Sequence, residues 1–213
     1  MGAKLESPES SGGEPNTPAE PLRLVTAAAA TGAEKLPGTR PLLELEIDLL
    51  RKVFGPGLKY LVVRLTRMSG VVASINGSRA FTLRNTIHLP AKAYNAMAQY
   101  PSLLVHEMVH VWQYQHEGWT YATDALWAQI GGDGYDFAKA LRQGKPWKKM
   151  NPEQQAQMIQ EAFRLGYFDN PGALFGLFNN KACVVRSSAQ PPQGFTDSTS
   201  VLVDAVALLR KPA

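Results

Sequence analysis

Residues 103–113 read LLVHEMVHVWQ, and this stretch contains the strongest indication of the fold and chemistry of the chain. It contains an HExxH pattern, in which His106, Glu107 and His110 stand among apolar side chains. Because residues four apart lie on one face of a helix, both imidazoles can point toward one metal ion. Glu107, one position from His106, can take a proton from a water molecule held there. The pattern predicts a helix that carries a metal site.

Apolar side chains cover nearly the whole circumference of this helix, which predicts that it is buried. Two histidines and a carboxylate in the interior would cost on the order of several kcal/mol unless they were paired or bound to a metal. The alternative interpretation is a polar trio satisfied by hydrogen bonds alone. We take the metal site as the better interpretation of the three residues.

The N-terminal region differs in composition from the rest of the 213 residues. Residues 1–38 are rich in Pro, Gly, Ser, Glu and Ala, so they are expected to form a disordered tail. Residues 39–213 are long enough for one domain with a sizeable core. The net charge of +4 includes −3 from residues 1–20, which leaves +7 on the remainder without a long basic run. This balance argues against a nucleic-acid partner.

Targeting signals are the next feature that bounds the function. The N-terminus lacks a basic start followed by an apolar stretch, and no run approaches the roughly 20 apolar residues that span a bilayer. The single cysteine, Cys183, excludes an internal disulfide and fits a reducing compartment. We therefore expect a cytoplasmic protein, or one exported without a cleaved signal, with no membrane partner.

The order of the predicted elements indicates an α+β fold. A helix is expected over residues 41–54, and strands over 59–65, 71–75, 80–83 and 85–89, with Asn76-Gly77 as a hairpin turn. Further helices are expected at 91–99, 101–117, 121–130, 135–141, 151–165 and 199–209, and a strand at 181–186. A small twisted mixed sheet should therefore pack on a mainly helical domain, and residues 86–89 are expected to form its exposed edge strand.

Three residues compete to be the third protein ligand that a catalytic zinc usually has. His116 lies ten residues after His106, but Gln113 stands where a glycine would be needed to turn the helix back. Glu153 follows Asn151-Pro152, a strong helix start, and could reach the metal from a second helix. Glu161 lies two turns further along nearly the same face. Physical arguments alone leave the choice open.

Two motifs carry a resemblance to a known family. HExxH followed by Val111-Trp112-Gln113, together with Glu153-Gln-Gln-Ala downstream, resembles the gluzincin side of the zincins, and more narrowly small bacterial proteins linked to secretion or contractile-injection gene clusters. The resemblance implies a zincin-like fold, one zinc ion per chain, and His106, His110 and Glu153 as its ligands. Gln157 departs from the pattern, which has an aspartate there that orients a ligand histidine, so another group would have to make that contact.

The activity that this resemblance implies is zinc-dependent hydrolysis of a peptide or protein substrate. Glu107 would act as the general base, and Tyr121 or Tyr135 could stabilise the oxyanion. Of the two tyrosines we name Tyr135 as the candidate catalytic residue. The alternative function is a non-catalytic, zinc-stabilised binding or assembly module linked to a bacterial secretion or injection system.

Overall fold

The computed structural model describes residues 38–68, 79–95, 97–118, 134 and 136–213. They belong to one compact unit, Glu34–Ala213, so the predicted tail at 1–38 lies almost entirely outside the described residues and stays a prediction. The hairpin predicted around Asn76-Gly77 and the helix predicted at 121–130 also lie outside them. Among the described residues, no helix combines the length and apolar character that a membrane-spanning segment requires.

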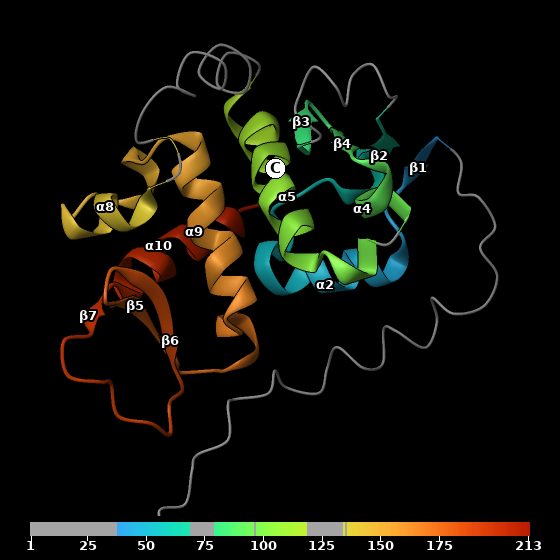
Figure 1. Cartoon of the computed structure of the whole chain (residues 1–213). Coiled ribbons are helices and arrows are strands. Elements are labelled where there is room, and N and C mark those ends of the chain that lie inside the picture. Colours follow the sequence, from blue (N-terminus) through green and yellow to red (C-terminus); the bar gives the residue numbers. More distant parts are fainter. Residues whose placement is uncertain (1–37, 69–78, 96, 119–133, 135) are drawn as a thin grey trace, which may run out of the picture. The chain divides into compact units, whose positions relative to one another are not determined.

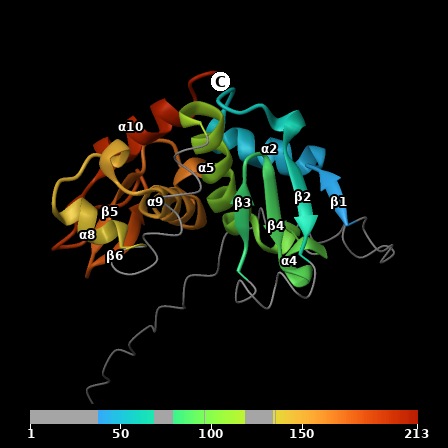
Figure 2. The same cartoon turned by 90° about the horizontal axis from the view of Figure 1, so that it is seen from above.

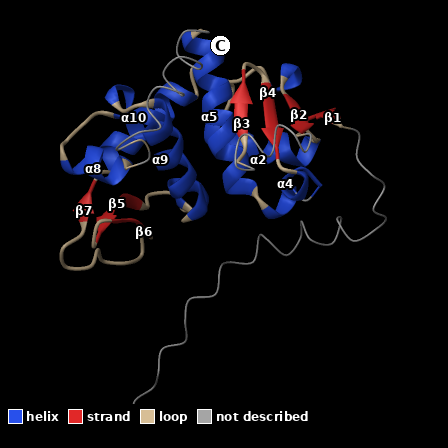
Figure 3. Cartoon of the chain, turned by 45° about the horizontal axis from the view of Figure 1, so that its top comes forward, coloured by secondary structure: helices blue, strands red, loops and turns tan. Residues whose placement is uncertain are grey.

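Two small sheets and several helices make up the fold, which confirms the α+β class (Figure 3). In chain order the elements are β1 Thr39–Pro41, α2 Glu44–Phe54, η2 Tyr60–Val62, β2 Arg64–Arg67, β3 Phe81–Leu83, β4 Thr86–Leu89, α4 Ala91–Asn95, η3 Met97–Gln99, α5 Pro101–Glu117, α8 Phe137–Arg142, η4 Trp147–Lys149, α9 Pro152–Arg164, η5 Tyr167–Asp169, β5 Leu174–Phe178, β6 Lys181–Val185, β7 Thr196–Asp197 and α10 Thr199–Leu209.

The first sheet is mixed and has the strand order β1-β2-β4-β3. β2 pairs parallel to β4, whereas β1 and β3 pair antiparallel to their neighbours. The prediction that residues 86–89 form an edge strand was wrong, because β4 pairs on both sides. Among the described strands, β3 lies at that edge instead. The alternation of apolar residues in a strand shows which of its faces is buried, but it does not show which strands pair with it. The parallel pairing of β4 with β2 joins two segments that are separated by residues 68–85.

The second sheet has the order β6-β5-β7, and the sequence analysis found only one of its strands. β5 and β6 are joined by Asn179-Asn180, whose φ angles of 50° and 61° are both left-handed. Asparagine tolerates this conformation, so Asn-Asn between two apolar runs is the signal that could have identified the hairpin. At Gly176 a Cβ atom would overlap the carbonyl oxygen of Thr196, which explains why glycine allows β7 to approach β5.

Helix α5 lies at the centre, between the first sheet and α9 (Figures 1 and 2). The predicted buried helix is confirmed, since residues 104–113 are all buried. Ala156 of α9 is fully buried and α9 packs along α5. Helix α10 packs against α2, and its C-terminal Arg210 donates hydrogen bonds to the carbonyl oxygens of Lys52 and Val53 at the end of that helix. The core is therefore continuous from the sheet through α5 to the C-terminal helix.

Candidate metal centre

Helix α5 presents three polar side chains inside the core. His106, Glu107 and His110 are only 8%, 3% and 7% exposed, and the two imidazole rings lie 5.1 Å apart. Pro101 opens the helix at a position where its missing N–H costs nothing, and the helix continues without a break to Glu117. The four-residue spacing thus places both imidazoles on one face, as the sequence predicted.

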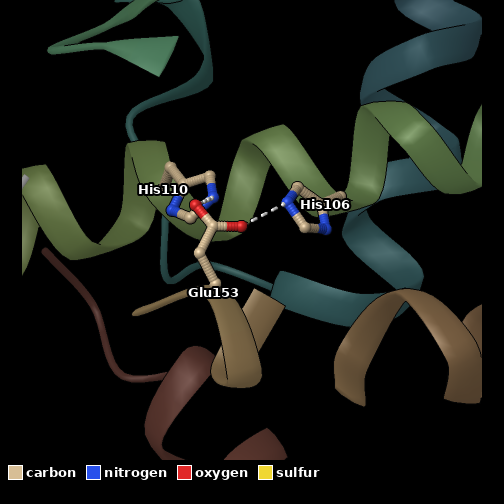
Figure 4. Close-up of side chains that lie close together, drawn as sticks. All are labelled: His106, His110 and Glu153. Atoms are coloured by element: carbon tan, nitrogen blue, oxygen red, sulfur yellow. Dashed lines mark ion pairs between the residues drawn. The ribbon is translucent and has the colours of Figure 1, made fainter. Parts of the chain in front are cut away.

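Glu153 reaches the same place from α9. Asn151 caps that helix by accepting a hydrogen bond from the backbone N–H of Gln154 at 2.8 Å, and Pro152 occupies the first turn. The Glu153 carboxylate lies between the two rings (Figure 4), with Oε2 3.4 Å from Nε2 of His106 and Oε1 3.4 Å from Nε2 of His110. Two nitrogen atoms and a carboxylate from separate helices therefore converge on one point.

The other ring nitrogens face glutamine carbonyl oxygens. Nδ1 of His106 lies 2.9 Å from Oε1 of Gln160, and Nδ1 of His110 lies 2.8 Å from Oε1 of Gln113. An amide oxygen can only accept, so Nδ1 of each ring donates to it. In a neutral ring the lone pair then lies on Nε2, the atom that faces Glu153. The pattern has an aspartate at position 157 that orients a ligand histidine, and this chain has Gln157 there. Gln160 and Gln113 make contacts of that kind with the two histidines instead.

Electrostatics favour positive charge at this point. Burial by itself would raise the pKa of Glu153, but hydrogen bonding and charge from both imidazoles outweigh it and hold that pKa well below its usual range. Burial by itself would lower the pKa of His110, whereas pairing with Glu153 and the nearby charge of Glu107 raise it above its ordinary value. Both shifts favour positive charge between the two rings and the carboxylate, which is the charge that a metal cation would bring.

The donor atoms suit a zinc ion. All three ligand atoms lie within 4.8 Å of one another. A tetrahedral zinc with bonds of about 2.0–2.1 Å holds neighbouring ligand atoms roughly 3.3 Å apart. The nitrogen–oxygen separations of 3.4 Å come close to that value.

Glu107 is held from the sheet side. The hydroxyl of Thr82, on edge strand β3, donates to Oε2 of Glu107 at 2.7 Å, and both residues are buried. Glu107 is close enough to His110 for its charge to act on that ring. The cluster is therefore flanked by β3 on one side and by α9 on the other.

The two competing ligands lie elsewhere. His116 stacks on Trp112 at 4.6 Å, and its Nε2 lies 2.9 Å from the carbonyl oxygen of Gly57. Glu161 pairs with Arg164 at 2.6 Å and lines a separate open cavity of about 490 Å³ between α8, α9 and the β5–β6 turn. The structure brings neither of them to the HExxH residues. His116 stays on α5, which is helical through Glu117, and Glu161 pairs with Arg164 further along α9.

The aromatic candidates cannot be placed. Tyr121 and Tyr135 lie outside the described residues, so the expectation that Tyr135 stabilises an oxyanion stays a prediction. The sequence analysis missed Thr82, Gln160 and Gln113 as partners of the cluster. Gln160 lies seven residues after Glu153 and Gln113 three after His110, both at helical spacing. These two could have been found from the sequence, whereas the contact of Thr82 could not.

Comparisons with known proteins find similarity to a core domain and to a type VI secretion spike protein. Residues 53–118 match the eCIS core domain. The chain is 33% identical over 168 residues to the type VI secretion system spike protein VgrG2b of Pseudomonas aeruginosa, covering 69% of this chain but only 16% of that protein. The solved structure of the effector domain of Pseudomonas aeruginosa VgrG2b aligns with a TM-score of 0.43 and 24% identity, covering 68% of this chain and 88% of that one.

These findings correct the family resemblance. The matches name an eCIS core domain and a secretion spike protein, so placing the chain on the gluzincin side of the zincins was wrong, as were the class labels metallopeptidase and hydrolase taken from it. The two motifs cover residues 106–113 and 151–156 only, and such a ligand pattern describes a local geometry that different folds can share. Hydrolytic activity must therefore be inferred from the geometry of residues in this chain and not from the zincin resemblance.

Proposed function

We propose that this chain is a metal-dependent module of a bacterial secretion or injection system, with one zinc ion held by His106, His110 and Glu153. The observation that carries the metal site is the Glu153 carboxylate, one oxygen of which lies 3.4 Å from Nε2 of His106 and the other 3.4 Å from Nε2 of His110. The match to the eCIS core domain and the 33% identity to a type VI secretion spike protein support the link to such a system.

The choice of zinc rests on the donor set and on burial. Imidazole nitrogen and carboxylate oxygen are ligands that zinc accepts in tetrahedral sites with one open position. The charges of both carboxylates of the centre, Glu107 and Glu153, raise the pKa of His110 inside the core. A divalent cation would balance their charge where water cannot reach them freely.

As an assembly module, the chain would use the metal to join α5 and α9. His106 and His110 come from one helix and Glu153 from the other, so metal binding would stabilise the packing between them. A ligand that binds only the folded state stabilises it by mass action. The partner of such a module would be a protein of the secretion apparatus, with no role for nucleic acid or membrane.

Hydrolysis of a peptide bond is the second candidate function, and Glu107 is the observation that favours it. A purely structural site has no need of a buried carboxylate beside its ligands. When bound, zinc would lower the pKa of a water molecule and polarise a carbonyl group. Glu107, positioned by the hydroxyl of Thr82 at 2.7 Å, would take the proton of that water and return it to the leaving amine.

The metal site is tested by elemental mass spectrometry of purified protein. We expect about one zinc per chain in the wild type and a sharp loss in Glu153→Ala. Glu161→Ala is the matched control, because Glu161 lies on the same helix and pairs with Arg164 outside the cluster. Zinc retained by Glu153→Ala would contradict the ligand assignment, and a wild type without zinc would overturn the proposed function.

Glu107→Gln separates the two functions. This substitution keeps the size of the side chain and removes its capacity to take a proton. We expect it to retain zinc. Loss of all cleavage of a broad peptide library, relative to a cleaving wild type, would establish hydrolysis. A wild type and a Glu107→Gln variant that cleave nothing, yet bind the same secretion partner, would leave the assembly function.

A further inference from the structure

We propose that Gln113 and Gln155 form a buried amide relay that sets the tautomer of His110. The same contacts hold the first turn of α9, which carries Glu153. This inference rests on the metal site proposed above and assigns a positioning role to two residues that do not touch the metal.

The relay begins at the backbone after α8. The amide nitrogen of Gln155 donates to the carbonyl oxygens of Trp147 at 3.2 Å and Met150 at 3.3 Å. Carbonyl oxygens only accept, so the NH₂ group of Gln155 must face them. Oε1 of Gln155 is thereby directed the other way, toward Gln113.

Gln113 can then take only one orientation. The side-chain amide atom of Gln113 that faces Gln155 lies 2.7 Å from Oε1 of Gln155. Because that oxygen only accepts, the atom of Gln113 must be the donor Nε2. The same nitrogen lies 3.3 Å from the carbonyl oxygen of Pro152, a second group that only accepts. Turning the amide over would place two acceptors against its oxygen. Oε1 of Gln113 is therefore left to face His110.

The consequence for His110 is a single tautomer. Oε1 of Gln113 lies 2.8 Å from Nδ1 of the ring, so Nδ1 carries the proton. The lone pair of the neutral ring then sits on Nε2, the atom 3.4 Å from the Glu153 carboxylate. A histidine in the opposite tautomer would present an N–H group to the metal position.

The relay also ties the two halves of the site together. Gln113 belongs to α5, whereas Pro152 and Gln155 flank Glu153 on α9. Trp147 adds a return contact, since its Nε1 donates to the backbone oxygen of Gln155 at 3.2 Å. Gln113 and Gln155 are each only 1% exposed, so water cannot readily replace either partner. One set of hydrogen bonds thus orients one ligand and positions another.

The tautomer is measured by nitrogen-15 NMR of the histidine rings in metal-free Glu153→Ala protein, at a pH where both imidazoles are neutral. Removing the carboxylate leaves the relay as the group that selects the tautomer of His110. We expect a protonated Nδ1 and an unprotonated Nε2. Adding Gln155→Met should give a mixture of tautomers. Protonation of His110 at Nε2 in Glu153→Ala protein would overturn the proposal.

Zinc affinity provides the second measurement, made on Gln113→Met and Gln155→Met, which keep the side-chain size and remove the amide. Each should weaken zinc binding by about 10–100-fold, and the double variant should lose little more than the weaker-binding single variant, because both act in one relay. A folded Gln155→Met variant with wild-type zinc affinity would contradict the relay. So would a double variant whose loss of zinc affinity equals the product of the two single losses.

Two controls accompany these variants. Gln160→Met removes the contact to His106 and should weaken zinc binding without changing the tautomer of His110. Gln115→Met removes an amide of α5 that bonds to Lys59 and Asn85, away from the site, and should leave zinc affinity unchanged. Should Gln113→Met or Gln155→Met fail to fold, the Glu153→Ala tautomer measurement still decides. That measurement needs no metal, so the two proposals fail separately. A wild type without zinc would overturn the proposed function, whereas the tautomer of His110 alone decides the relay.

Discussion

At the residue scale, each of three side chains in the proposed centre is hydrogen-bonded to a neutral polar side chain. Thr82 holds Glu107, Gln160 holds His106, and Gln113 holds His110. A buried acceptor that loses its donor costs more free energy than the hydrogen bond itself contributes. Single substitutions in these partners should therefore be measurable even when the ligands are untouched.

Thr82→Val tests the partner of Glu107. The substitution keeps the branched shape and removes the hydroxyl that donates to the buried carboxylate at 2.7 Å. We expect the free energy of unfolding to fall by about 1–3 kcal/mol while zinc content stays at the wild-type level. Chemical denaturation measures the first quantity and elemental mass spectrometry the second. Thr86→Val on neighbouring β4 is the control. Equal stability of Thr82→Val and wild type would mean that the contact contributes nothing.

Tyr60 supplies a prediction of pH dependence. Burial, partly offset by Arg51, raises the pKa of Tyr60 from 10.0 to about 12, and its hydroxyl donates to the carbonyl oxygen of Gly55 at 2.7 Å. The folded state thus favours the neutral phenol. This stabilisation is complete below the unfolded pKa of 10.0 and is lost as pH rises toward about 12.

Ionisation of Tyr60 should lower the free energy of unfolding by at most about 2–3 kcal/mol, from the conversion of the pKa difference into free energy. Denaturation midpoints recorded across the alkaline range should decline more steeply for the wild type than for Tyr60→Phe. The variant starts from a lower stability, because it lacks the hydrogen bond to Gly55. Identical alkaline slopes for the two proteins would exclude Tyr60 as the titrating group.

At the element scale, the centre depends on how closely α9 approaches α5. Ala156 is fully buried one turn after Glu153, and α9 is the helix that packs along α5. A small side chain at such a position lets two helix axes come together. The edge strand β3 contributes from the opposite side through Thr82.

Ala156→Leu should disturb both packing and metal binding. Extra methylene groups in a packed interior cost about 1–3 kcal/mol, and a displaced α9 would withdraw Glu153 from the imidazoles. We expect lower unfolding free energy together with reduced zinc per chain. Ala138→Leu, at a half-buried position of α8, serves as the matched control and should leave zinc content unchanged. Full zinc occupancy in Ala156→Leu would show that the approach of α9 does not govern the site.

At the scale of the whole molecule, the core runs without interruption from the first sheet to the last helix. The aliphatic part of Arg210 lies where a Cβ on Gly55 would make close contact, and its guanidinium caps the carbonyl end of α2. Gly57 allows an even closer approach, since a Cβ atom there would overlap the carbonyl oxygen of Leu209. The proposed metal centre lies within this core, so metal binding should respond to the stability of the whole unit.

Zinc should raise the thermal stability of the whole unit. A ligand present at about a hundredfold above its Kd stabilises the folded state by about 2.7 kcal/mol. The Tm of the metal-stripped wild type should rise with added zinc, and a chelator should reverse the change. Glu153→Ala should show a much smaller response. A wild-type Tm that ignores zinc would argue against a metal that joins α5 to α9.

The sequence by itself determined the features that depend on local spacing. The helical period placed His106 and His110 on one face, the apolar residues around them predicted burial, and Asn151-Pro152 predicted the start of α9. The order of strands and helices was sufficient for the α+β class. Gln160 and Gln113 also lie at helical spacing from the residues of the cluster. Each of these properties follows from residues within a few turns of one another.

Only the tertiary structure decided which distant residues meet. His116, Glu153 and Glu161 were all possible third ligands, and the packing of α9 on α5 brings Glu153 to the imidazoles. The edge position of β3, the contact of Thr82 with Glu107, and the contact of Gln113 with Gln155 likewise depend on long-range packing. Sequence spacing fixes neighbours only within one helix or strand, whereas contacts between elements follow from how their buried faces fit together.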